Sequence, residues 1–71
     1  MGMYLVFDPT TGNVSGRVTV GDDSTMRDRL DAMRISLADY DSSPEIWAQV
    51  DLRTREIGPR AGHADPRKKP R

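Results

Sequence analysis

Two aspartates in matching positions are the residues of this sequence best suited to acid–base chemistry. Asp8 is followed three positions later by Thr11, and Asp51 is followed at the same distance by Thr54. Two carboxylates held close together can serve as general acid and general base. The same spacing is also typical of tight turns, in which an aspartate side chain accepts backbone N–H groups. Turn capping accounts for both residues, so we expect them to be structural and the protein not to be an enzyme.

The other chemistry-bearing residues exclude most metal and nucleophilic sites. The sequence has no Cys, and its single His, His63, lies among Pro, Arg and Lys residues near the C-terminus. Oxygen-bearing side chains alternate over Asp39–Glu45 as at the start of a calcium-binding loop. However, Pro44 stands where such a loop needs Gly, and no Glu occupies its last position. We expect no metal, no cofactor and no small-molecule ligand.

Two β-hairpins are expected to carry the two turns. Met3–Phe7 is a continuous apolar run, which indicates a strand covered on both faces, and Val14–Val20 alternates as a half-buried strand does. Gly12 is suited to the left-handed position that leads into the return strand. Further on, Glu45–Leu52 alternates, and Glu56–Ile57 predicts a brief fourth strand.

One amphipathic helix is predicted between the hairpins, at about Thr25–Ala38. Its apolar stripe is formed by four residues at helical spacing: Met26, Leu30, Met33 and Leu37. The expected fold class is therefore α+β, in ββαββ order, with a small antiparallel sheet of about four short strands and one helix on a face. So small a body is marginally stable alone, so we expect self-association or docking on a larger assembly.

The two predicted hairpins repeat each other. Residues 4–14 align with residues 47–57, so that an aromatic residue, an apolar residue, Asp, Thr and a final Val or Ile recur at the same spacings. Arg55 takes the place of Gly12, so the second turn should be the more strained one.

This pairing resembles a class of small bacteriophage proteins that open with a Tyr-x-x-Phe/Tyr-Asp-x-x-Thr-Gly-x-Val hairpin and close with a Val-Asp-x-x-Thr-x-Glu-Ile hairpin before a Pro/Arg tail. The matching residues are Tyr4, Phe7, Asp8, Thr11, Gly12, Val14, Val50, Asp51, Thr54, Glu56, Ile57 and Arg60. The resemblance implies a structural virion component associated with the tail, tail fibre or capsid. It implies assembly in the host cytoplasm, other phage structural proteins as partners, and a homo-oligomer or several copies per particle.

Trp47 is a candidate anchor for a partner protein, because it falls with Gln49 on the more polar face of its predicted strand. Alternatively, Trp47 covers the second face of the sheet beside Tyr4. If that face is open, Tyr4, Trp47 and Gln49 form an interface patch that requires a partner.

Charge divides the sequence into an acidic body and a basic tail. Residues 1–59 contain six arginines and ten acidic residues, a net charge of −4, whereas residues 60–71 contain five basic residues and one acidic residue, a net charge of +4. We therefore expect a domain at 1–59 and an extended, Pro-containing basic C-terminal tail at 60–71. The residues of this basic arm are Arg60, Arg67, Lys68, Lys69 and Arg71.

Two alternatives to a virion component follow from these charges. The acidic body could imitate phosphates, as in a phage-encoded inhibitor that resembles anti-CRISPR proteins and blocks a host protein. The basic arm could instead make weak, nonspecific contacts with nucleic-acid phosphates, since no aromatic residue is interleaved to stack on bases. No apolar run approaches the length of a membrane span, so we expect no membrane partner.

Overall fold

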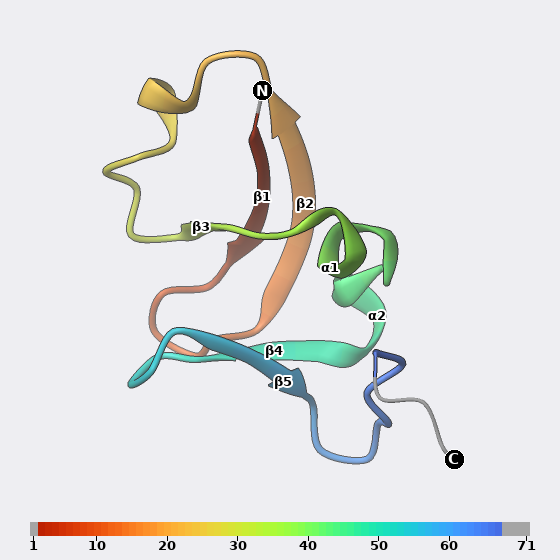
Figure 1. Ribbon diagram of the computed structural model, residues 1–71. Coiled ribbons are helices and arrows are strands. Elements are labelled where there is room, and N and C mark those ends of the chain that lie inside the picture. Colours follow the sequence, from red (N-terminus) through yellow and green to blue (C-terminus); the bar gives the residue numbers. More distant parts are fainter. Residues whose placement is uncertain (1, 68–71) are drawn as a thin grey trace.

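Five short strands form two antiparallel sheets in the computed structural model, which describes residues 2–67 (Figure 1). The first sheet has the order β2-β1-β3, and the second consists of β4 and β5. The strands are β1 (Gly2–Phe7), β2 (Val14–Val20), β3 (Ala32–Arg34), β4 (Ala48–Asp51) and β5 (Glu56–Pro59). The predicted α+β class with antiparallel sheets is therefore confirmed, although the strands divide between two sheets instead of forming one.

The two predicted hairpins are present, and β1 is the central strand of its sheet. β1 pairs with β2 from Gly2↔Val20 to Phe7↔Val14, with an irregular register between Val6 and Phe7. On its other side β1 pairs with β3. Because β1 has a neighbour on each edge and its side chains are covered on both faces, a continuous apolar run is the composition that it requires.

The predicted helix at Thr25–Ala38 is wrong. A 3₁₀ turn at Asp23–Thr25 is followed by irregular turns and then by β3. The residues of the predicted apolar stripe therefore do not share one buried face, since Met26 is buried whereas Leu30 is 77% exposed. Backbone pairing explains the outcome, because a covered β1 needs hydrogen-bond partners on its second edge. The segment supplies them through bonds from the Phe7 N–H to the Asp31 carbonyl (2.8 Å) and from the Ile35 N–H to the Met3 carbonyl (2.9 Å).

Two short helices replace the single long one, α1 (Leu37–Asp41) and α2 (Pro44–Trp47). The Ser36 side chain caps α1 by accepting the N–H of Asp39, and Pro44 begins α2 in the first helical turn. The predicted strand at Glu45–Leu52 therefore begins only at Ala48, because its first residues belong to α2. Within residues 2–67, neither helix has the length and apolar character that crossing a membrane requires.

An ionic and aromatic contact holds the helices to the first sheet. The guanidinium of Arg17 on β2 lies 4.9 Å from the centre of the Tyr40 ring and 3.4 Å from a carboxylate oxygen of Glu45. The same arginine donates a hydrogen bond to the Tyr40 carbonyl. The Arg17 side chain of β2 thus contacts both α1 and α2.

The core is divided by the alternation of β1. Leu5 and Phe7 belong to the main cluster, which also contains Val14, Ile35, Trp47, Ala48 and Val50. Tyr4 points to the other face and joins a smaller cluster with Met26 and Ala32. The second sheet and α2 cover the first of these faces, and the loop that contains Met26 covers the other.

Candidate functional site

The two aspartates that are candidates for chemistry are both occupied in turns. The Asp8 carboxylate accepts the Thr10 N–H (2.8 Å) and the Thr10 hydroxyl (2.7 Å). These bonds lower the pKa of Asp8 below its ordinary value, the side-chain bond having the larger effect. The Asp51 carboxylate accepts the Arg53 N–H at 2.9 Å. The Thr11 hydroxyl accepts the N–H of Asn13 (3.2 Å).

The backbones of the two turns are also alike. The Gly12 N–H donates to the Asp8 carbonyl (2.8 Å), and the Arg55 N–H donates to the Asp51 carbonyl (2.6 Å). Both donors are left-handed, with φ of 80° at Gly12 and 59° at Arg55. The alignment of the two hairpins predicts this arrangement. Thr54 has no side-chain bond among residues 2–67 that matches that of Thr11.

The two turns differ in what they touch. The Gly12 carbonyl accepts the Val50 N–H (2.8 Å), and a Cβ at Gly12 would lie 2.1 Å from the Val50 carbonyl oxygen. The first turn is thus pressed onto β4 and joins the two sheets. The second turn sends the Arg55 side chain to β3, where it donates to the Ala32 carbonyl (3.3 Å) and lies 5.7 Å from the Phe7 ring.

The predicted interface patch is wrong in its exposure. Trp47 is 5% exposed and Tyr4 6% exposed, and they belong to different core clusters. Trp47 ends α2 instead of facing out from a strand, and its indole N–H donates to the Ser42 carbonyl (3.0 Å). Of the three residues, Gln49 alone is exposed. The alternative that Trp47 packs beside Tyr4 is also wrong, because they lie in separate clusters.

Two residues of the predicted basic arm belong to the folded body. Arg60 donates to the carbonyls of Glu45 (3.0 Å) and Ala48 (3.3 Å). Arg67 lies 5.0 Å from the Trp47 ring, and Asp65, at 2.8 Å, raises the pKa of its guanidinium. The chain from Arg60 to Arg67 is therefore anchored at both ends instead of extending freely. Lys68, Lys69 and Arg71 lie outside the described residues.

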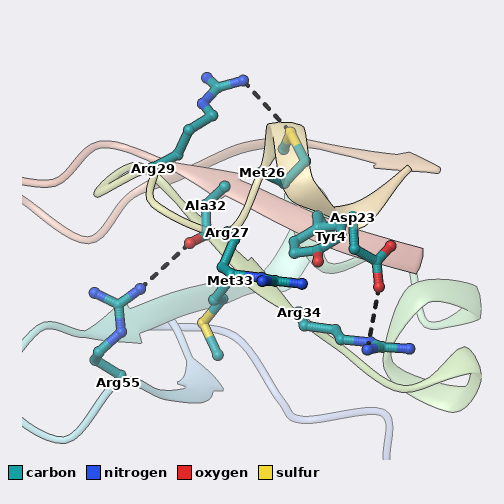
Figure 2. A pocket seen from close by; sticks show the side chains of 9 residues that line it. All are labelled: Tyr4, Asp23, Met26, Arg27, Arg29, Ala32, Met33, Arg34 and Arg55. Carbon is teal, nitrogen blue, oxygen red and sulfur yellow. Dashed lines mark hydrogen bonds and ion pairs between the residues drawn. The ribbon is translucent and has the colours of Figure 1, made fainter. Parts of the chain in front are cut away.

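A hollow of about 410 Å³ beside β3 gathers four of the eight arginines of residues 2–67 (Figure 2). It is lined by Arg27, Arg29, Arg34 and Arg55 together with Tyr4, Asp23, Met26, Ala32 and Met33. Figure 2 shows Arg34 and Arg55 at two sides of the hollow, with Arg27 between them in this view and Arg29 directed away toward the Met26 sulfur. The lining contains four arginines and one aspartate, which gives a net charge of +3.

The four guanidinium groups are not equally available. Arg34 is paired with Asp23 (3.2 Å), and Arg29 with Asp31 (2.7 Å). The pair with Arg29 lowers the pKa of Asp31, chiefly through the hydrogen bond. Within residues 2–67, the Arg55 guanidinium bonds only to the Ala32 carbonyl, and Arg27 has neither a hydrogen bond nor an ion pair. Arg27 and Arg55 thus carry positive charge with which no carboxylate of the described residues forms an ion pair.

A second hollow of about 340 Å³ continues from the first between β3 and β5. Met33, Arg34 and Arg55 line both hollows. The second has a lining with more balanced charge, in which Ile35 and Ile57 accompany Asp39, Glu56 and Arg67. We call the two connected hollows the arginine groove. A guanidinium has five N–H donors in a planar fork, so this groove is suited to carboxylates or phosphates.

The sequence does not single out the arginine groove. Its lining arginines are spread from Arg27 to Arg55, and Arg27 and Arg34 fall within the predicted helix but outside its apolar stripe. The one available signal was Arg55, since an arginine at a left-handed position is unusual in a turn that Gly would fill. For metal chemistry, no group of three His, Cys, Asp or Glu side chains within residues 2–67 is placed to hold an ion.

No protein-family model, no curated protein and no solved structure matches this chain. The groove and the chemistry of the turns are therefore the features that bear on function.

Proposed function

We propose that this protein is a non-enzymatic docking component of a bacteriophage particle, which attaches to an acidic surface of a larger assembly through the arginine groove. The two Asp-x-x-Thr turns support a place in a phage particle, because the pair resembles the hairpins of small bacteriophage proteins. The arginine groove supports docking as the activity, since most acidic groups that could do chemistry are engaged in turns and ion pairs. Asp8 and Asp51 bind turn N–H groups, and Asp31 and Asp39 pair with arginines.

The observation that carries the proposal is the unbalanced charge of Arg27 and Arg55 in one hollow. Guanidinium groups without carboxylate partners gain most from an incoming anion, because no existing pair has to be broken. The loop that holds Arg27 also exposes the apolar side chain of Leu30, which is 77% exposed. Positive charge beside an exposed apolar residue favours a protein surface with acidic and apolar groups as the partner.

Mass spectrometry of particles purified from a lysate of the encoding phage tests this function. We expect the protein at a fixed ratio to the major structural proteins, and we expect Arg27→Gln to lower that ratio. Arg53→Gln is the matched control, because Arg53 is exposed in the second turn and does not line the groove. Absence of the wild-type protein from particles, with recovery on a host complex, would contradict the proposal and favour the inhibitor alternative.

A further inference from the structure

In the part of the chain that the structure describes, no strand pairs with the outer edge of β3, which borders the arginine groove. β3 is the last strand in the order β2-β1-β3, and its three residues pair with Tyr4, Leu5 and Val6. The bonds between Phe7 and Asp31 and between Ile35 and Met3 fix the alternation of this antiparallel ladder. By that alternation Met33 bonds toward β1, whereas the N–H and C=O groups of Ala32 and Arg34 point outward.

A side chain, and not a strand, covers this edge. Among residues 2–67, the Ala32 carbonyl is the one outward group of β3 with a hydrogen-bond partner, the Arg55 guanidinium at 3.3 Å. Arg55 therefore occupies the place in which the N–H of an added strand would stand. Its bond is long and its residue is exposed, so an incoming backbone can replace it and release the guanidinium for another partner.

The two hollows meet along this edge. By the alternation of β3, Ala32 and Arg34 share the Tyr4 face, and Met33 and Ile35 lie on the other face. Ala32 lines the first hollow alone, Ile35 lines the second alone, and Met33 and Arg34 line both. A strand added to β3 would direct every second side chain toward Arg27 and Arg34. The side chains between them would point toward Met33 and Ile57. The groove thus matches a segment in which acidic and apolar residues alternate.

We propose that the arginine groove binds an extended acidic segment of a partner protein as an added strand on β3. This inference rests on the proposed docking function and names how its partner is recognised. The incoming backbone pairs with Ala32 and Arg34, and its carboxylates bind Arg27 and the released Arg55. A nucleic acid fits less well, because a phosphodiester supplies no N–H donor for the Arg34 carbonyl and the buried Tyr4 ring offers no face for a base.

Fluorescence anisotropy with the full-length protein and a labelled peptide of alternating Glu and Val tests the inference. We expect saturable binding, and we expect N-methylation of every second peptide amide to weaken it about tenfold, the effect of losing one or two backbone hydrogen bonds. Arg27→Gln should weaken binding to a similar extent, and Arg53→Gln should leave it unchanged. NMR hydrogen exchange should show the Ala32 and Arg34 amides protected only when the peptide is present.

The possible failures are distinguishable. Two peptides can be made, with N-methyl groups on the odd-numbered or on the even-numbered amides. If both bind as tightly as the unmodified peptide, and the Ala32 and Arg34 amides gain no protection, strand addition is overturned but docking on an acidic surface remains. Failure of the peptide to bind, with the protein still present in purified particles, also removes the inference alone. Tighter binding of a single-stranded thymidine decamer than of the peptide, lost in Arg27→Gln, overturns both proposals in favour of a nucleic-acid site.

Discussion

The first turn (Asp8–Gly12) and the second turn (Asp51–Arg55) have the same local hydrogen bonding but different roles. In each, an Asp side chain accepts the N–H two residues on, and a left-handed residue donates to the Asp carbonyl. The first turn is buried against β4 through Gly12 and joins the two sheets. The second turn faces the arginine groove and places Arg55 against the free edge of β3.

The difference shows how two copies of one turn can take different roles, the first in stability and the second in recognition. A side chain at position 12 has no space, so Gly is the one residue that meets both the backbone angle and the contact. At position 55 the angle also favours Gly, yet an arginine stands there and reaches two partners. Backbone strain that is retained in a folded protein points to a use for the side chain that causes it.

The largest expected effect is on the first turn. Gly12→Ala places a Cβ 2.1 Å from the Val50 carbonyl oxygen in a residue with φ of 80°. We expect the free energy of unfolding to fall by about 3 kcal/mol or more, since the turn must leave β4 or distort. Urea unfolding followed by the fluorescence of Trp47 measures this. An unchanged midpoint would show that the two sheets are not held together by this contact.

The contrast between the turns also explains what sequence could predict. Turn residues act over four or five positions, so Asp8, Gly12, Asp51 and the strained Arg55 were visible in the sequence. The hairpins followed from them, because turn chemistry and strand alternation agree there. Local patterns are sufficient where no distant segment competes.

Long-range pairing explains what was missed. The stripe at Met26–Leu37 has helical spacing, but the second edge of β1 required backbone partners, and β3 supplied them. Trp47 alternates as a strand residue does, but Pro44 starts a helical turn that takes it into the core. The arginine groove was missed through the first of these errors, since its arginines meet only when β3 replaces the helix and the second turn folds toward it.

A smaller effect on stability, with a larger one on recognition, is expected at the second turn. Arg55→Gly relieves about 1 kcal/mol of backbone strain and loses the contacts with Ala32 and Phe7. These terms oppose each other, so we expect the free energy of unfolding to change by less than about 1 kcal/mol. Binding of the Glu/Val peptide should still fall several-fold, as measured by anisotropy. Destabilisation as large as that of Gly12→Ala would show that both turns serve stability.

The smallest expected effect concerns the carboxylate of the first turn. The bonds from Thr10 hold the pKa of Asp8 below its ordinary value of 3.8 in the folded state. A group whose pKa is lower when folded stabilises the protein above its unfolded pKa, and this stabilisation is lost as pH falls through the folded pKa. Asp8→Asn removes this titration, so the loss of stability in acid should be shallower in the variant than in the wild type.

Asp51→Asn provides the matched comparison for Asp8→Asn. One backbone N–H binds the Asp51 carboxylate, whereas Asp8 also accepts the Thr10 hydroxyl. Thermal melts across the acid range test the prediction for Asp8→Asn, and at neutral pH they should show a smaller loss of stability for Asp51→Asn than for Asp8→Asn. Equal losses of stability for the two variants would mean that the hydroxyl of Thr10 adds nothing to the first turn, and that the turns differ only in what Gly12 and Arg55 contact.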